Sequence, residues 1–302
     1  MKIFMTGGTG FVGTNLTKQL TEKGHEVTVL TRAIREDVPL PKGASYLVGN
    51  PTEEGAWQEK VAEHEAIINL AGASIFGRWT KSAKKVMWES RITTTQNLVE
   101  AFSARQAKDK IFLSTSAVGY YGPHEDEELD EESSLGDDFL ASLAREWESS
   151  AKKAEGFGAR VVLLRFGIVF GKNGGALRQM VPVFNRYLGS PLGSGKQWFP
   201  WVHEQDLAKI YLHVLEEKGI SGPINCTAPN PVRNEELTKI LGEVLGKPTF
   251  MPAVPGFILK MIMGEFGSVL LKGQKVLPKR LLNSGFHFSF PVIREALQDL
   301  LR

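Results

Sequence analysis

The sequence predicts an α/β fold, in which a doubly wound parallel sheet is followed by a smaller C-terminal α+β region. Through the first 170 residues, short apolar runs rich in β-formers alternate with longer stretches of helical periodicity, which is the pattern of right-handed βαβ units. The runs at residues 67–70 and 161–164 read as continuous apolar segments, typical of strands covered by helices on both faces. A glycine-rich stretch at residues 6–13 directly follows the first run.

The expected elements follow one another in regular order. Strands are predicted at residues 2–6, 26–31, 45–48, 66–70, 110–114 and 160–166. Helices are predicted between them at residues 12–23, 53–62, 81–104 and 138–155. After about Gly171 the pattern loosens, and Gly and Pro are dense at residues 189–195. Further helices are expected at residues 204–217 and 234–245. The last helix, at 291–301, begins with Pro and keeps an apolar stripe.

These elements suggest a division of the chain near residue 170. Residues 1–170 are expected to form a nucleotide-binding Rossmann domain, to which residues 197–226 could add sheet-side contributions. Residues 171–302 are expected to form the smaller substrate-side region, ending in a short terminal domain at about 250–302. The acidic run at residues 125–132 lies between a strand and a helix. Such runs are usually solvated loops, and a mobile lid over the site is the alternative.

Composition excludes several classes of protein. A chain of 302 residues is long enough for one large or two modest domains. Its net charge of +2 is too small for a dedicated nucleic-acid binder. The lone Cys226 rules out an intrachain disulfide and suits a reducing compartment. The six histidines include no pair at i, i+4, so we expect no metal site.

No membrane partner is expected either. The N-terminus lacks the apolar core and cleavage site of a targeting peptide. Residues 251–271 are the best candidate for a span, but Pro, Gly, Lys and Glu interrupt them. A helix that packs on its own protein or on a partner is the expected alternative. We expect a cytoplasmic protein, possibly a homodimer.

The glycine-rich stretch has the surroundings of a pyrophosphate-binding loop. It reads Thr-Gly-Gly-Thr-Gly-Phe-Val-Gly between a strand and a helix. Gly7 would permit the tight turn, Gly10 the approach of the phosphates, and Gly13 close packing of helix on strand. Backbone N–H groups near Phe11 and Val12 would face the phosphates at the helix N-terminus. Thr6 and Thr9 complete the expected loop contacts, which favour a dinucleotide ligand over a simple structural turn.

The end of the second strand favours NADP(H) over NAD(H). NAD enzymes usually end this strand with an acidic residue, which binds the ribose 2′-hydroxyl. This strand ends in Thr31-Arg32, and Arg35 follows shortly after. A guanidinium pairs well with a 2′-phosphate. The alternative is that Arg32 is an ordinary exposed arginine.

Further stretches repeat the pattern of a known superfamily. They are residues 69–73 (Asn-Leu-Ala-Gly-Ala), 114–116, 164–167 and 202–206. With the glycine loop, they make the chain resemble the extended short-chain dehydrogenases/reductases, which include nucleotide-sugar epimerases and dehydratases. Residues 69–74, 90–92, 114–122, 147–148 and 271–300 resemble more narrowly the atypical "epimerase family" proteins once labelled cell-division-inhibitor-like. The resemblance adds Leu70, Ala71, Gly72, Ser114 and Phe166 to the expected cofactor contacts.

The catalytic pair of this superfamily is absent. The resemblance implies a Tyr-x-x-x-Lys pair about 25 residues after the Ser, in which the Lys assists proton transfer by the Tyr. None of the five tyrosines is followed by Lys four residues later, and the expected helix at residues 137–148 has neither residue. Ser116 fits the superfamily pattern, and alignment puts Arg91 at the position of the usual helical Asn.

Other side chains must therefore supply any acid–base chemistry. Tyr120, Tyr121 and His203 are candidates, although packing in a loop, or for His203 a place at a helix start, is the stronger interpretation of each. Arg91 could clamp an anionic substrate or pair with a nearby carboxylate. Residues 197–202 carry aromatics and no Arg, which weakens the nucleotide-sugar interpretation. Trp198 and Trp201 there fit a ligand with a flat face or core packing.

The sequence thus predicts an NADP(H)-binding protein that resembles oxidoreductases and epimerases and has a divergent active site for an unidentified small molecule. The alternative, from another class, is a non-catalytic NADP(H)-sensing or interaction protein. A nucleotide-sugar epimerase comes third.

Overall fold

A parallel sheet forms the centre of the structure, a computed structural model that describes residues 1–34, 39–103, 109–172 and 174–302. Within these residues its seven strands are, from edge to edge, β12 (Gly222–Cys226), β7 (Arg160–Phe166), β5 (Ile111–Ala117), β4 (Ala66–Asn69), β1 (Lys2–Thr6), β2 (Glu26–Thr31) and β3 (Ala44–Val48). The chain runs outward from β1 in both directions, so the strand order reverses beside β1. Ligands bind at the carboxyl ends of the strands at such a reversal.

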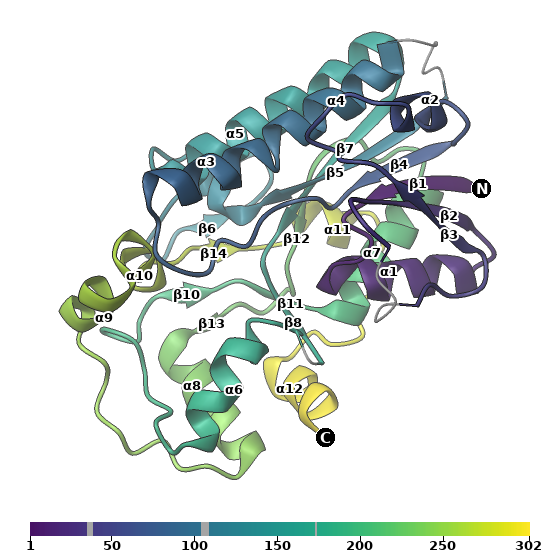
Figure 1. Ribbon diagram of the computed structural model, residues 1–302. Helices are drawn as coiled ribbons and strands as arrows, with labels where there is room; N and C mark the ends of the chain where they lie inside the picture. The colour runs from purple at the N-terminus through teal and green to yellow at the C-terminus, as the bar shows by residue number, and fades with distance from the viewer. Residues whose placement is uncertain (35–38, 104–108, 173) are drawn as a thin grey trace.

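Helices cover both faces of the sheet (Figure 1). Alternate β1 side chains point to opposite faces: Ile3 and Met5 pack under α1 (Phe11–Glu22) and α7 (Glu204–Glu216), and Phe4 packs on the other side. That other face is covered by α2 (Trp57–Val61), α4 (Ile92–Ser103) and α5 (Phe139–Lys152). The doubly wound parallel sheet predicted from the sequence is confirmed.

A second hydrophobic core lies below the carboxyl ends of the strands. It contains Phe170 and Trp201, both fully buried, and the apolar sides of α6 (Leu177–Asn185), α8 (Asn234–Leu245) and α12 (Ile293–Leu301). Three short strands, β8 (Ile168–Gly171), β9 (Gly174–Gly175) and β11 (Trp201–His203), form a small sheet beside it. A two-stranded sheet joins β10 (Trp198–Phe199) to β13 (Val232–Arg233).

The C-terminal part of the chain returns to the main sheet. The strand β14 (Lys275–Val276) pairs with β6 (Glu128–Leu129), and α11 (Lys279–Asn283) packs beside β12. Two short helices, α9 (Gly256–Met263) and α10 (Glu265–Leu270), project at the left edge of the molecule in Figure 1. The region after residue 170 therefore supplies β12 and α7 to the Rossmann unit in addition to its own small sheets.

Two expected helices differ from the sequence prediction. The helix expected at residues 81–104 is divided into α3 (Lys81–Glu89) and α4. The division lies at Ser90 and Arg91, whose side chains both donate hydrogen bonds to the Met87 carbonyl and so compete with helical bonding. The helix expected at 53–62 is shorter, because residues 50–55 form hydrogen-bonded turns.

None of the helices in the described ranges has the length and apolar character needed to cross a bilayer.

Candidate functional site

The glycine loop is built so that its backbone stays exposed to a ligand. Gly7 has a φ of +72°, a conformation that favours glycine. A Cβ on Gly13 would lie 2.2 Å from the Gly7 oxygen, so only glycine fits where α1 meets the loop. Gly10 is the N-cap of α1. A Cβ added there would have only one neighbour within 4 Å, the Gly7 oxygen at 3.2 Å. The loop thus has its open side at Gly10 and at the free N–H groups that begin α1, the arrangement that binds a pyrophosphate.

The segment after β4 lies against this loop. A Cβ on Gly7 would be 2.7 Å from the Leu70 carbonyl and 2.9 Å from the Ala71 nitrogen. The structure therefore brings Leu70 and Ala71, both expected cofactor contacts, beside the glycine loop. Gly72 follows and is exposed.

A chain of buried hydrogen bonds fixes these two segments to the helices behind them. Thr6 Oγ1 donates to Asn69 Oδ1 at 2.7 Å, and Asn69 Nδ2 donates to Thr95 Oγ1 at 2.8 Å. Trp147 Nε1 of α5 donates to the same hydroxyl at 3.0 Å. The ends of β1 and β4 are thus held in one position relative to α4 and α5.

The ring of Phe11 is enclosed by the β8–β9 hairpin. A Cβ on Gly171 or Gly174 would lie only 2.0–2.3 Å from atoms of this ring, and one on Gly175 would lie 3.0 Å away. The backbone of Phe11 therefore begins α1 at the open side of the glycine loop, while its side chain packs against a hairpin that is distant in the sequence.

Of the remaining expected cofactor residues, Arg32 and Phe166 lie at the carboxyl ends of their strands, and Ser114 lies in the middle of β5. Arg32 directly follows β2, is exposed, and has no acidic partner among the described residues. Arg35 lies outside the described residues. The Oγ of Ser114 on β5 is buried and accepts or donates no hydrogen bond within the described chain. Phe166 ends β7, half-buried, with its ring edge-on to Tyr211.

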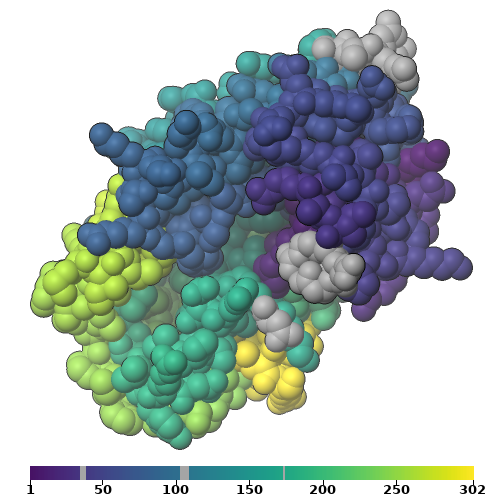
Figure 2. Space-filling model, in the orientation of Figure 1, coloured from purple at the N-terminus to yellow at the C-terminus, as the bar shows by residue number. Residues whose placement is uncertain are grey.

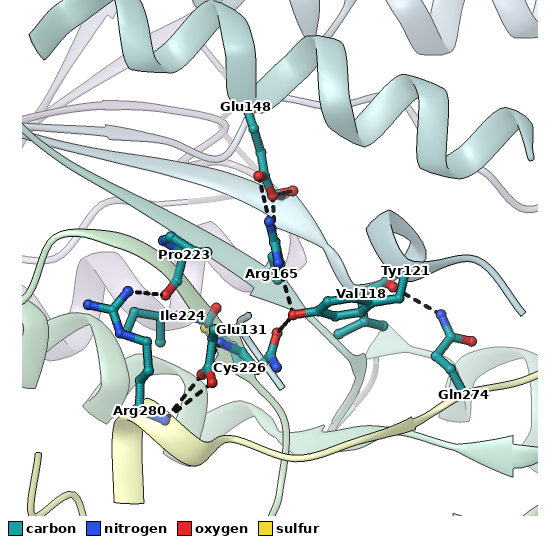
Figure 3. A network of polar contacts seen from close by, with 12 residues as sticks. Val118, Tyr121, Glu131, Glu148, Arg165, Pro223, Ile224, Cys226, Gln274 and Arg280 are labelled. Atoms are coloured by element: carbon teal, nitrogen blue, oxygen red, sulfur yellow. Dashed lines mark hydrogen bonds and ion pairs between the residues drawn. The ribbon is translucent and has the colours of Figure 1, made fainter. Parts of the chain in front are cut away.

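Ser116 is connected to a buried ion pair that the sequence analysis did not single out. Its Oγ donates to Glu148 Oε1 at 2.7 Å. Arg165 donates to both oxygens of the same carboxylate, at 2.7 and 2.8 Å (Figure 3). The two charged side chains are only 3% and 4% exposed. Burial opposes ionisation of Arg165, but its hydrogen bonds to Glu148 raise the pKa of the guanidinium, which therefore stays charged.

The network continues to Tyr121. Arg165 donates to the Tyr121 hydroxyl at 2.9 Å, and this hydroxyl donates to Asn225 Oδ1 at 2.7 Å. Burial raises the pKa of Tyr121 to about 12, which favours the neutral phenol. We call the five residues Ser116, Glu148, Arg165, Tyr121 and Asn225 the buried network. It crosses the site from α5 to β12, and each of its hydroxyl groups already donates inside the protein.

Tyr120 is placed differently from its neighbour. Both tyrosines belong to the 3-10 helix η1 (Val118–Tyr121), but Tyr120 is half-buried. The guanidinium carbon of Arg165 lies 3.5 Å from the centre of its ring. Its hydroxyl forms no hydrogen bond to any described residue. Of the two tyrosines, Tyr120 is the one with a hydroxyl still available to a ligand.

Arg91 supports the loop after β4. Its guanidinium donates to the carbonyls of Ala73 and Met87, at 3.0 and 3.1 Å, and lies 5.2 Å from the Trp147 ring. It has no carboxylate partner among the described residues, and burial lowers its pKa to about 10. The predicted salt bridge is therefore absent from the described structure. The guanidinium also lies beside the exposed Gly72, because a Cβ added to that glycine would be 3.2 Å from it.

The acidic run at residues 125–132 is held in place along its length. Asp126 pairs with Arg233, Glu128 with Lys275, and Asp130 with Lys279. The carboxylate of Glu131 is buried and accepts the N–H groups of Asn225 and Arg280 (Figure 3). Burial raises the pKa of Glu131. These contacts argue against the mobile lid and make the run a connector between the sheet and the C-terminal segment.

The other residues considered from sequence have structural contacts. Trp201 is buried and donates to the Asn230 carbonyl, and Trp198 donates to Asp126 at 2.8 Å. His203 is buried at the start of α7, where Nδ1 accepts the Gln205 N–H. Its Nε2 lies 3.3 Å from Asp299 on α12.

A cavity of about 210 Å³ opens beside η1. It is lined by Trp79, Gly119, Gly122, Pro123, Asp138, Phe139, Leu140, Glu265, Ser268, Val269, Lys272 and Gln274. The lining combines aromatic and aliphatic walls with a few polar groups, as small-molecule sites usually do. It adjoins the tyrosine-bearing turn but contains neither Ser116 nor Tyr120.

Comparison with known proteins gives two family matches. The profile of the NAD dependent epimerase/dehydratase family matches residues 3–226, and that of a domain of unknown function (DUF1731) matches residues 254–300. The "Epimerase family protein SDR39U1 homolog, chloroplastic" of Arabidopsis thaliana is 41% identical over 100% of this chain and 87% of its own length. The "Epimerase family protein YfhF" of Bacillus subtilis is 39% identical over 100% and 98%.

Solved structures are similar along the whole chain. The human epimerase family protein SDR39U1, crystallised with NADPH, is 37% identical with a TM-score of 0.87 and covers 99% of both chains. A nucleoside-diphosphate sugar epimerase from Corynebacterium glutamicum is 32% identical, with a TM-score of 0.80, over 100% of this chain and 58% of that one.

Proposed function

The chain belongs to the NAD dependent epimerase/dehydratase family, and from this premise we propose that it binds NADP(H) and transfers hydride between this cofactor and a small molecule. The fit of the cofactor site supports the proposal. The loop at Gly7–Gly13 leaves its backbone open where a pyrophosphate would bind, and Arg32 follows β2 where a 2′-phosphate would need a cation. The human relative was crystallised with NADPH.

The observation that carries an enzymatic role is the buried network. It replaces the absent Tyr-x-x-x-Lys pair with a charged chain that begins at Ser116, at the carboxyl end of β5. Because the Ser116 hydroxyl donates to Glu148, its oxygen can accept a hydrogen bond from a substrate hydroxyl next to the reacting carbonyl. Ser116 would thereby orient the reacting carbon, and Glu148 would orient Ser116.

Tyr120 is the side chain that would hold and move the proton. Its hydroxyl is not committed within the described protein, and the Arg165 guanidinium lies against its ring. NADPH, when bound, supplies the hydride. The Tyr120 phenol would give its proton to the carbonyl oxygen of the substrate as that oxygen gains charge.

A specific observation also favours a second candidate, a protein that binds NADP(H) without turnover. The hydroxyls of Ser116 and Tyr121 both donate to internal partners. Neither hydroxyl of the buried network is therefore free to donate a proton to a substrate, and a site made only to sense the cofactor would need no such donor in the network.

Thermal stabilisation tests the choice of cofactor. NADPH should raise the melting temperature more than NADH at equal concentration, because only a ligand bound to the folded state stabilises it. Arg32→Ala should remove most of that difference. Lys218→Ala, an exposed lysine after α7, is the matched control and should leave it unchanged. Equal stabilisation of the unaltered protein by both cofactors would refute the role of Arg32.

Turnover distinguishes the two candidates. Carbonyl compounds would be screened for NADPH oxidation, and Tyr120→Phe compared with the unaltered protein on any substrate found. Loss of the phenol should lower kcat by about 10²–10⁴-fold while leaving the NADPH dissociation constant nearly unchanged. Tyr187→Phe, which alters an exposed tyrosine remote from the network, serves as the control. A Tyr120→Phe variant with full turnover would exclude this residue as the proton donor.

A further inference from the structure

One face of the molecule combines exposed apolar side chains with lysine and arginine. It is formed by residues 76–89, which include α3, and residues 256–272, which include α9 and α10. We call it the α3/α9 face. The cofactor site and the buried network use none of its exposed side chains.

The two segments lie side by side although about 170 residues separate them. Lys84 of α3 forms an ion pair of 2.6 Å with Glu265 of α10. The Phe76 ring is edge-on to Phe266, 5.7 Å away, and the Arg78 side chain lies beside Gly264. Figure 2 shows the segments next to each other at the left edge, α3 in blue and α9–α10 in yellow-green.

The face holds a concentrated positive charge. It contains six cationic residues, Arg78, Lys81, Lys84, Lys85, Lys260 and Lys272, and two carboxylates, Glu89 and Glu265. These give it a formal charge of +4, although the whole chain carries only +2. The rest of the molecule is therefore slightly acidic.

The same face exposes large apolar side chains. Phe257, Met261 and Ile262 on α9 are 70%, 67% and 65% exposed, and Val86 and Trp88 on α3 are 50% and 37% exposed. Figure 1 places α9, which carries the three most exposed of these side chains, at the outer edge of the molecule. Apolar groups gathered in this way mark a surface that binds something.

We propose that the α3/α9 face binds the surface of an anionic lipid bilayer. Projecting apolar side chains can enter the boundary between headgroups and acyl chains, while lysines beside them reach the charged headgroups. The apolar stretch at residues 251–271 cannot span a bilayer, because its helices are too short, but it can lie on one. The sequence alone suggested no membrane partner, since it did not show which of these side chains are exposed.

The charge of the face argues against a second copy of the chain as its partner. Two copies that meet through this face would form an isologous interface, in which the α3/α9 face of one copy contacts the α3/α9 face of the other. A charge of +4 would then face another +4. Anionic headgroups complement it instead.

Sedimentation with vesicles tests the proposal. Vesicles of phosphatidylcholine alone would be compared with vesicles of equal parts phosphatidylcholine and phosphatidylglycerol, in buffer of about 0.1 M salt. The protein should bind the anionic vesicles at least tenfold more strongly than the neutral ones. Raising the salt to about 0.5 M should release it, because surface charges are screened over a shorter distance.

Paired variants assign the binding to the face. Each of Lys81→Ala and Lys260→Ala should weaken binding to anionic vesicles about fivefold. Phe257→Ser with Met261→Ser should weaken it at least tenfold. The controls Lys218→Ala with Lys239→Ala, and Val48→Ser, alter exposed residues outside the face and should bind as the unaltered protein does. Melting curves would establish that each variant is folded.

Three outcomes would overturn the proposal. The first is equal binding to neutral and anionic vesicles. The second is equal loss of binding in the control variants and the face variants. The third is absence of vesicle binding together with a dimer in solution that Phe257→Ser and Met261→Ser dissociate, which would assign the face to a second copy.

Discussion

Removal of one partner of the Glu148–Arg165 pair should destabilise the protein strongly, and removal of both should not. Glu148→Leu leaves the buried Arg165 guanidinium without its carboxylate and the Ser116 hydroxyl without its acceptor. Breaking a buried ion pair in this way costs about 3–5 kcal/mol. Arg165 keeps its bond to Tyr121 and its contact with the Tyr120 ring, so the lower part of this range is expected.

The size of the thermal effect follows from the length of the chain. An unfolding entropy of about 2.1 cal/mol/K per residue over 302 residues gives roughly 0.6 kcal/mol per degree. A loss of about 3–4 kcal/mol should therefore make the single variant melt about 5–6 °C below the unaltered protein. The double variant, Glu148→Leu with Arg165→Met, exchanges the pair for apolar groups and should fall within about 1–2 kcal/mol of the original stability.

The assay is urea unfolding of the four proteins of this double-mutant cycle, followed by far-ultraviolet circular dichroism. If each single variant loses about 3 kcal/mol and the double variant about 1–2 kcal/mol, the cycle should give a coupling free energy of about 4–5 kcal/mol. The exposed pair Arg145–Glu146 on the same helix is the control, and its coupling should be below about 1 kcal/mol. Additive single variants at Glu148 and Arg165 would refute the view that the two charges depend on each other.

Three other perturbations have distinct expected results. Gly10→Val should abolish NADPH binding and leave the melting temperature nearly unchanged, because only the Gly7 oxygen is close to the new Cβ. Gly13→Ala should both abolish binding and lower the melting temperature, and equal melting temperatures of the two variants would contradict this difference. Burial lowers the pKa of His203 in the folded protein. As the pH falls below about 6.5, this imidazole is therefore protonated in the unfolded chain before it is protonated in the folded one, and the free energy of unfolding should decline. His203→Asn, which can still cap α7, should flatten that decline in urea titrations between pH 5 and 7; an unchanged profile would show that another group titrates. In calorimetric titration, Phe11→Ala should weaken NADPH binding more than Phe11→Leu does, since leucine still contacts the β8–β9 hairpin and alanine does not. Equal affinities of the two variants would contradict the view that this contact holds the glycine loop in place.

The sheet could be predicted because its determinants are local. Each buried strand is a short apolar run, and the glycine loop identifies the first βα turn from three glycines. The break between α3 and α4 was not predictable, because the side chains that mark it also bond to a different loop: the Ser90 hydroxyl accepts the Ala73 N–H, and Arg91 donates to the Ala73 carbonyl. Periodicity continues through the break and gives no sign of it.

The buried network shows where sequence reasoning stops. The resemblance already included the positions of Glu148 and Arg165, but neither residue belongs to the catalytic pattern expected of the superfamily. Glu148 lies on α5 and Arg165 on β7, and only the packing of that helix on the sheet brings them together. The absence of Tyr-x-x-x-Lys was visible in the sequence, whereas the buried network that we propose in its place was not.

The enclosure of Phe11 by the β8–β9 hairpin has a consequence for synthesis of the protein. The glycine loop lies within the first 13 residues, yet the glycines that surround its aromatic ring extend to residue 175. While a ribosome is still making the first half of the chain, the loop has no hairpin to hold it. A nascent chain should therefore become able to retain a dinucleotide only after more than half of its length has emerged, late in translation rather than at its start.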